Sequence, residues 1–233
     1  MILYAIPAPL GGAPAAALPA AALEIVRGLA DFVVERPKSA RAFLSGIGMA
    51  RPLRELSFAV LDEHTRAAEV PALLAPLREG RPLGLLSEAG CPAIADPGAA
   101  LIEAAHREGF TVRPLVGPSS IVLALMASGM QGQRFAFCGY LPREPREREA
   151  RIRALEKRSR AEDETEVFIE TPYRNDALLG ALLATCHETT RLCVAADLTL
   201  PSEAVATRTV AQWRALASPA IGRRPAVFLL YAR

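Results

Sequence analysis

The feature that most constrains the fold is a short apolar run that ends abruptly in a turn of small residues. Leu83-Gly84-Leu85-Leu86 carries no polar side chain, as a parallel strand covered on both faces requires. Ser87-Glu88-Ala89-Gly90-Cys91-Pro92 follows directly, where Gly90 lacks a Cβ that would keep a ligand off the backbone and Glu88 supplies a carboxylate. Such a turn is typical of open α/β sheets, which bind small molecules at the carboxyl ends of their strands.

The residues that follow repeat the same unit. Asp96-Pro97 predicts a helix N-cap followed by a proline at the first helical position, with the helix over 99–108. Residues 110–116 are the next predicted strand, and Gly117-Pro118-Ser119-Ser120 leads into a predicted helix over 121–128. This alternation of strands and helices predicts an α/β fold.

Length and hydrophobic content allow two domains. The chain has 233 residues, 51% of them hydrophobic, which suffices for one large or two modest cores. The pattern restarts after residue 114, so we predict two tandem α/β domains, 1–114 and 115–233. Further strands are predicted over 2–6, 32–34, 56–61, 135–139, 166–170, 192–196, 204–210 and 226–231. Further helices are predicted up to Gly28, from Ser39 toward Ser45, over 67–78 and 143–160, up to Thr185, and around Trp213.

Charge and cysteine content exclude several classes of protein. A net charge of +2, from 27 basic and 25 acidic residues, gives no global signature for nucleic acid, so such a partner needs a local patch. The four cysteines lack CxxC spacing, and no metal-ligand pattern is present, so we expect a reducing cytoplasm and no metal. The apolar runs are too short for a membrane span, and no signal peptide is predicted.

Small-residue loops follow three predicted strands, over 7–12, 87–94 and 117–120. Glycine permits close backbone approach to a ligand there, although glycine, proline, aspartate and serine also punctuate ordinary strand-to-helix connections. The chain contains neither GxGxxG nor GxxxxGK[ST], which argues against a dinucleotide or nucleoside triphosphate enzyme.

The amino-acid sequences of two of these loops resemble those of a known family. Ser-Glu-Ala-Gly-Cys-Pro-Ala-Ile-Ala-Asp-Pro-Gly at 87–98, with Gly-Pro-Ser at 117–119, resembles the tetrapyrrole methylase superfamily. The nearest resemblance is to its branch that methylates a ribose 2′-hydroxyl in small-subunit ribosomal RNA, whose usual wording is Ser-Asp-Ala-Gly-x-Pro-x-Ile-Ser-Asp-Pro-Gly. Pro9-Leu10-Gly11, Tyr140-Leu141-Pro142-Arg143 and Thr171-Pro172-Tyr173-Arg174 are similar to other motifs of that branch.

The resemblance implies a methyl donor, S-adenosylmethionine, in a cleft between two α/β domains of the tetrapyrrole methylase type. It also implies a homodimer. The donor would be bound largely through backbone groups of the three loops. The residues assigned to it are Pro9, Leu10, Gly11, Ser87, Glu88, Ala89, Gly90, Ile94, Gly117, Pro118, Ser119 and Ser120.

The chemistry of a ribose acceptor adds a second set of candidates. Methyl transfer from a sulfonium is an in-line displacement that depends mainly on positioning, but a ribose hydroxyl must also lose its proton. Glu35 and Glu170 are the candidate general bases. Arg41 and Arg174, which stand at retained motif positions, complete the predicted catalytic set.

Three departures from the branch leave alternatives open. Arg36 stands where the branch usually has aspartate, and Leu200 stands where it has lysine. The branch also usually continues with a further small helical segment beyond the equivalent of Arg233. One alternative is a methyltransferase acting on a corrin, a porphyrin or another small molecule. Another is a regulatory protein that binds S-adenosylmethionine without transferring its methyl group.

A basic segment is the candidate surface for ribosomal RNA or the small subunit. Residues 143–160 hold eight arginines or lysines against four glutamates, with Glu147/Arg151 and Glu149/Arg153 at helical i,i+4 spacing. A solvated helix explains this pattern as well as a surface that follows phosphates does.

Overall fold

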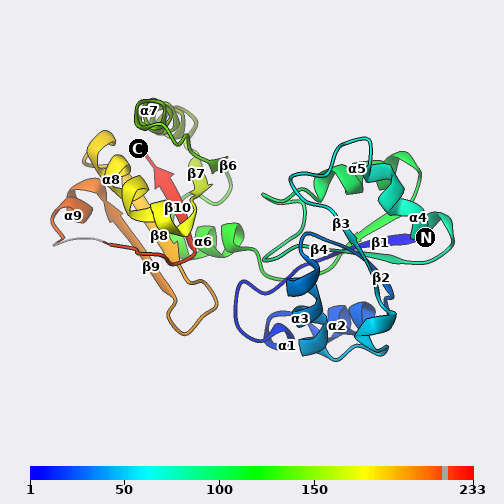
Figure 1. Ribbon diagram of the computed structural model, residues 1–233. Helices are drawn as coiled ribbons and strands as arrows, with labels where there is room; N and C mark the ends of the chain where they lie inside the picture. The colour runs from blue at the N-terminus through cyan, green and yellow to red at the C-terminus, as the bar shows by residue number, and fades with distance from the viewer. Residues whose placement is uncertain (217–219) are drawn as a thin grey trace. The chain divides into compact units, whose positions relative to one another are not determined.

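The computed structural model describes residues 1–216 and 220–233 (Figure 1). The chain divides into two compact units, Met1–Ser119 and Ser120–Arg233, so the first unit extends to residue 119 rather than 114. The reason is local packing: the loop after residue 114 returns to the first unit, where the Cys91 thiol donates to the carbonyl of Pro118.

The first unit is built on a wholly parallel five-stranded sheet in the order β3-β2-β4-β1-β5. Its strands are β1 (Ile2–Ile6), β2 (Asp31–Val34), β3 (Ser57–Val60), β4 (Leu83–Leu86) and β5 (Thr111–Pro114). The predicted α/β fold is confirmed, and β4 is buried along its whole length, as its continuous apolar run requires. Ile6 and Val34 both pair with Leu86, which aligns the carboxyl ends of the three central strands.

Helices cover both faces of this sheet. They are α1 (Pro14–Ala17), α2 (Ala20–Arg27), α3 (Pro37–Ile47), α4 (Ala75–Arg78) and α5 (Ala99–Arg107), with 3₁₀ turns η1 (Leu53–Glu55) and η2 (Val70–Leu74). Residues of α2 and α3 share a core with Ile6, Phe32 and Leu86, whereas residues of η2, α4 and α5 share one with Leu3 and Val33. Figure 1 shows α1, α2 and α3 on one side of the strands and α4 and α5 on the other.

This arrangement creates a switch point at the carboxyl edge. The chain leaves β1 and β2 toward the face covered by α1–α3, but it leaves the intervening strand β4 toward the face covered by α5. Loops that diverge from neighbouring parallel strands open a crevice between them, which is where open α/β sheets bind ligands.

One predicted helix and one predicted N-cap in this unit are wrong. The predicted helix 67–78 is replaced by η2 and the short α4, because Pro76 has no amide to continue the hydrogen bonding through this segment. Asp96 does not cap a helix: α5 begins at Ala99 with Gly98 as its N-cap, and Asp96 instead accepts a hydrogen bond from the Gly98 amide at 3.3 Å.

The second unit contains a mixed five-stranded sheet in the order β6-β7-β10-β8-β9. Its strands are β6 (Phe135–Tyr140), β7 (Thr165–Ile169), β8 (Arg191–Ala196), β9 (Ala204–Thr209) and β10 (Ala226–Tyr231). Only β6 and β7 pair in parallel among the described strands of this sheet, and the remaining pairs are antiparallel.

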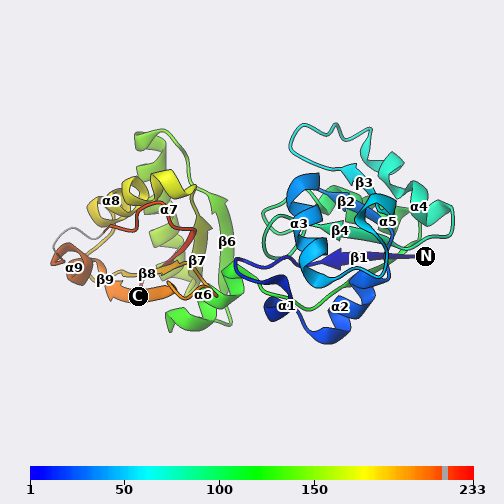
Figure 2. The ribbon, with the colours of Figure 1, turned by 60° about the horizontal axis from the view of Figure 1, so that its bottom comes forward.

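Helices again cover both faces of the second sheet. They are α6 (Ser120–Ser128), α7 (Pro145–Glu162), α8 (Asn175–Thr185) and α9 (Val210–Arg214), with the 3₁₀ turn η3 (Pro172–Arg174). Residues of α7, α8 and α9 form one core with Phe168 and Phe228, and α6 packs on the other face of the strands (Figure 2). Within the described residues, no helix is long and apolar enough to cross a lipid bilayer.

Candidate functional site

The three predicted loops of the first unit meet at the carboxyl edge of its sheet. Ala8 donates its amide to the carbonyl of Gly90 at 2.8 Å, and the Gly90 amide donates back to Ala8 at 3.0 Å. The third loop joins through Pro118, which accepts from Cys91. At Gly117 a Cβ would lie 2.4 Å from Cβ of Pro7, so only glycine allows this approach. The sequence predicts that each of these loops follows a strand, and the structure shows that the three loops are in contact.

Both backbone groups of Gly90 are bonded to the first loop. Its φ is +74°, a conformation that favours glycine, and both its amide and its carbonyl are bonded to Ala8. A Cβ at this position would point toward Leu10, at 3.5 Å, and toward the carbonyl of Pro118. Gly90 therefore fixes the shape of the loops and has no free amide to offer a ligand.

A pocket of about 170 Å³ lies beside these loops. Its lining residues are Ala8, Pro9, Gly11, Gly12, Pro14, Ser39, Ala40, Phe43, Leu86, Ser87 and Glu88. Four of the residues assigned to the donor are among them: Pro9, Gly11, Ser87 and Glu88. Typical small-molecule sites occupy about 300–1,000 Å³, so this pocket would enclose part of a molecule of that size.

The other residues assigned to the donor do not line this pocket. Leu10, Ala89, Gly90, Ile94, Gly117, Pro118 and Ser119 belong to the same three loops. Ala89 is exposed and Ile94 is 49% exposed, on the turn closed by its amide and the carbonyl of Cys91. Ser120 begins α6 and belongs to the second unit.

One wall of the pocket was not predicted. Ser39, Ala40 and Phe43 come from the first turns of α3, which follows β2. Their i, i+1, i+4 spacing places them on one side of the helix, with two small residues next to an aromatic one. That pattern at the start of a helix, directly after a strand at the carboxyl edge, is the signal that could have identified them.

Glu88 is the charged residue of the pocket. Its Oε1 accepts a hydrogen bond from the Ser39 hydroxyl at 2.5 Å, and its Oε2 lies 3.5 Å from a guanidinium nitrogen of Arg36. The loop after β4 is thereby joined to the start of α3. Arg36, which stands where the branch usually has aspartate, therefore pairs with a carboxylate that lines the pocket.

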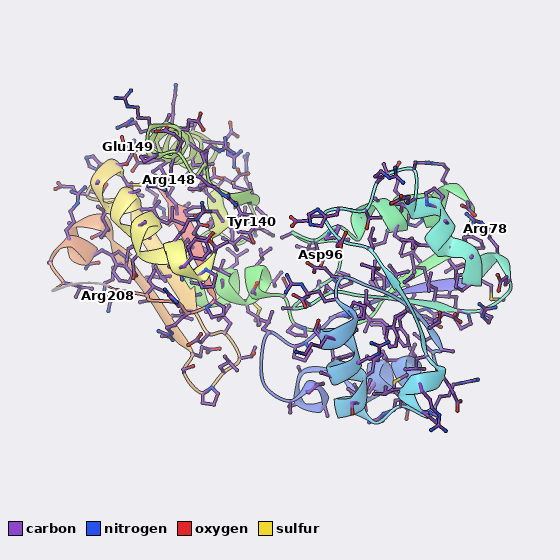
Figure 3. All side chains as sticks on the ribbon, in the orientation of Figure 1. Arg78, Asp96, Tyr140, Arg148, Glu149 and Arg208 are labelled. Atoms are coloured by element: carbon purple, nitrogen blue, oxygen red, sulfur yellow. The ribbon has the colours of Figure 1, made fainter. Side chains whose placement is uncertain are left out.

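Further carboxylates surround this pair. Burial raises the pKa of Glu35 above its usual value, and the negative charges of Asp96 and Glu88 raise it further, whereas Arg36 lowers it. Burial also raises the pKa of Asp96 (Figure 3), partly offset by the hydrogen bond from Gly98. Among residues 1–216 and 220–233, no group of three or more His, Cys, Asp or Glu is arranged to hold a metal ion.

Arg41 contacts an aromatic ring. Its guanidinium carbon lies 4.9 Å from the centre of the Phe58 ring, and Phe58 in turn stacks on Phe32 of the core. A cation over an aromatic face is an attractive arrangement. The observed contact holds the exposed side of α3 against β3.

Glu170 and Arg174 form a closed pair in the second unit. The Glu170 carboxylate is 1% exposed, and its Oε1 accepts from the Thr171 amide at 2.6 Å and from Nε of Arg174 at 3.0 Å. A second guanidinium nitrogen of Arg174 also donates to it. These contacts define the turn from β7 into η3.

The pocket offers two kinds of surface. Pro9, Phe43 and Leu86 provide apolar contact, while Glu88 provides negative charge beside the carboxylates of Glu35 and Asp96. A ligand that carries both a flat apolar ring and a positive charge matches this combination. S-adenosylmethionine has an adenine ring and a net positive charge, since its sulfonium and ammonium groups outweigh its one carboxylate.

Comparisons with known proteins identify the family of the chain. The model of the family "Tetrapyrrole (Corrin/Porphyrin) Methylases" matches residues 3–213. A ribosomal RNA small subunit methyltransferase I of Escherichia coli O157:H7 is 32% identical over 203 residues, which are 87% of this chain and 67% of the relative. One of Mesorhizobium japonicum is 32% identical over 215 residues, 92% of this chain and 68% of the relative. The chain thus spans about two thirds of the length of these relatives.

Solved structures share the fold. The methyltransferase CobJ superposes with a TM-score of 0.64 at 20% identity, covering 99% of this chain and 93% of that one. A uroporphyrin-III-C-methyltransferase from Thermus thermophilus gives a TM-score of 0.57 at 22% identity, covering 99% and 91%. The chain therefore belongs to the tetrapyrrole (corrin/porphyrin) methylase family of S-adenosylmethionine-dependent methyltransferases.

Proposed function

We propose that the protein transfers a methyl group from S-adenosylmethionine to a ribose 2′-hydroxyl of small-subunit ribosomal RNA. The relatives named ribosomal RNA small subunit methyltransferase I support the acceptor. The observation that carries the donor assignment is the pocket beside β1 and β4, whose wall combines apolar side chains with the carboxylate of Glu88.

Different pocket residues would contact different parts of the donor. Pro9, Phe43 and Leu86 would contact the adenine ring, and the small residues Gly11 and Ser87 would leave the backbone accessible. Glu88 would face the positive end of the donor. The rest of the proposed donor set is Leu10, Ala89, Gly90, Ile94, Gly117, Pro118, Ser119 and Ser120.

Glu35 is the better candidate for the general base. A base works best when its pKa approaches the working pH, and burial together with neighbouring carboxylates moves the pKa of Glu35 in that direction. Glu170 is almost fully buried and its Oε1 is bonded to Thr171 and Arg174. Glu170 and Arg174 would therefore fix the turn from β7 into η3, and Arg41 would hold α3 against β3.

The other partners and the location are part of the same proposal. A homodimer and a cytoplasmic location follow from the resemblance and from the cysteine content. Contact with ribosomal RNA or with the small subunit would use basic side chains of the segment 143–160. The donor assignment needs no metal ion.

The test is methyl transfer from labelled donor to small ribosomal subunits, free ribosomal RNA and a corrin or porphyrin substrate in parallel. We expect label in small-subunit RNA, at a position where the methylated ribose blocks alkaline cleavage of the following phosphodiester. Glu35→Gln should lower the rate without weakening donor binding, whereas Glu24→Gln on α2, an exposed carboxylate, serves as a control. Label in the ring substrate alone would contradict the proposed acceptor.

A further inference from the structure

The helix α7 presents one face to the core and the opposite face to solvent. Glu144 accepts a hydrogen bond from the Glu147 amide at 2.8 Å, Pro145 occupies the first turn, and Asp163 ends the helix in the left-handed conformation. Ile152, Leu155 and Ser159 are its buried residues. Their burial fixes which side of the helix faces outward.

The outward side carries a continuous basic stripe. Arg153, Lys157 and Arg160 follow Arg146 by seven, eleven and fourteen residues, close to two, three and four turns at about 3.6 residues per turn. All four side chains are exposed. Glu149 lies beside this line, next to Arg153, and the other glutamates of the helix point elsewhere, so four of the eight cations of segment 143–160 share one side of the helix.

Ion pairing leaves most of the stripe uncompensated. Arg153 pairs with Glu149 at 3.3 Å, and both side chains are solvated (Glu149 is labelled in Figure 3), so that pair is weak. In the described part of the chain, no ion pair involves Arg146 or Lys157, and Arg160 donates one hydrogen bond, to the backbone oxygen of Arg233 at 3.3 Å. Arg158, by contrast, is bonded to the fully buried Glu166 and is structural.

We propose that the stripe Arg146, Arg153, Lys157 and Arg160 binds the phosphate backbone of the RNA acceptor. This inference rests on the proposed function in that the acceptor is RNA. The stripe is roughly 21 Å long at about 1.5 Å per residue, long enough to face several successive phosphates. Guanidinium groups match phosphate oxygens in a bidentate fashion, and such contacts fix position without reading sequence.

The position of Arg151 provides an internal control. It is exposed on the same helix but lies away from the stripe, toward the side that carries Leu155. The predicted Glu147–Arg151 pair is not among the ion pairs of the described residues, so Arg151 differs from Lys157 mainly in where it points. A general attraction of RNA to positive charge would use both residues equally.

The test compares two full-length triple variants with equal loss of charge. One removes the stripe by Arg146→Ala, Lys157→Ala and Arg160→Ala. The other removes exposed arginines elsewhere by Arg51→Ala, Arg54→Ala and Arg151→Ala. The readout is the affinity for a transcript of small-subunit ribosomal RNA, measured by fluorescence anisotropy over a series of salt concentrations.

We expect the stripe variant to lose roughly tenfold to a hundredfold in RNA affinity and to show a shallower salt dependence, by roughly two to three units of slope. Its affinity for S-adenosylmethionine and its unfolding temperature should equal those of the wild type, because the changed side chains are exposed. The control triple variant should retain most of the RNA affinity.

Two outcomes overturn the inference: wild-type affinity and slope in the stripe variant, or equal losses in the two variants. Preferential binding of the wild type to phosphatidylserine vesicles would also overturn it and assign the stripe to a lipid surface. The proposed function fails separately. If the wild-type protein binds RNA through the stripe but transfers no label to it, the surface stands and the assigned acceptor does not.

Discussion

Two backbone hydrogen bonds join Ala8 and Gly90 at the carboxyl edge of the first sheet, with amide-to-carbonyl distances of 2.8 Å and 3.0 Å. These two residues follow the adjacent strands β1 and β4, whose loops diverge to opposite faces of the sheet. The bridge thus joins the two loops beside the pocket, whose lining includes Ala8 and Glu88. Its integrity depends on the conformation of Gly90.

Gly90→Ala should weaken donor binding, whereas an equally strained substitution away from the pocket should not. A side chain at φ +74° costs roughly 1–2 kcal/mol, and relief of that strain would break the bridge to Ala8. Gly80→Ala is the matched control, since Gly80 has φ +82°, no neighbouring atom within 4 Å and no contact with the pocket. Calorimetry with S-adenosylmethionine should show roughly tenfold weaker binding for Gly90→Ala alone; equal affinities in the two variants would contradict the role of the bridge.

Gly117→Ala tests the approach of the third loop. The added Cβ would lie 2.4 Å from Cβ of Pro7 and 2.8 Å from a methyl group of Leu18, so the loop must move outward. Overpacking of this kind costs roughly 1–3 kcal/mol. Urea unfolding should detect that loss, whereas Gly132→Ala, with no atom within 4 Å, should change stability little. An unaltered midpoint for Gly117→Ala would mean that the loop is not packed as described.

Arg174→Ala should destabilise the protein strongly. The substitution leaves the carboxylate of Glu170 almost fully buried without its cation, and breaking a buried pair in this way costs roughly 3–5 kcal/mol. Glu170→Gln combined with Arg174→Met should recover much of the loss, because no buried charge then remains. The measurement is the free energy of unfolding in urea. If Arg174→Ala were as stable as the wild type but inactive, the result would favour a catalytic role for Glu170 and Arg174.

Much of the first unit could be predicted because its signals are local. The apolar run at 83–86 gives β4 with the bounds observed, and three small-residue loops identify the carboxyl edge. The bounds of β1 and β10 were also predicted correctly, since both are apolar runs that end at turns or at the end of the chain.

What could not be predicted depends on contacts between distant residues. Ser39 and Phe43 have a recognisable spacing at the start of α3, but their contribution to the pocket also depends on the side of the sheet on which α3 packs. The resemblance showed only that Arg36 stands where the branch usually has aspartate. Its pairing with Glu88, fifty-two residues later in the chain, emerges from the register of β2 and β4.

The carboxylates around Arg36 make a prediction about pH. The pKa of Glu35 is raised above 4.5, so folding favours its protonated form; the stability it contributes is present below the unfolded pKa and is lost as pH rises through the folded pKa. Glu35→Gln should therefore stabilise the protein at pH 7 and give a much smaller gain near pH 4, where the carboxyl is mostly protonated in both states. Arg36→Asp should have the opposite effect, because it removes the cation that lowers the pKa of Glu35 and adds a negative charge beside Glu88. Urea unfolding at both pH values measures these changes, and a carboxyl NMR titration of Glu35 follows the pKa directly. A gain for Glu35→Gln that is equal at pH 4 and pH 7 would show that burial of the side chain, and not its charge, sets its contribution.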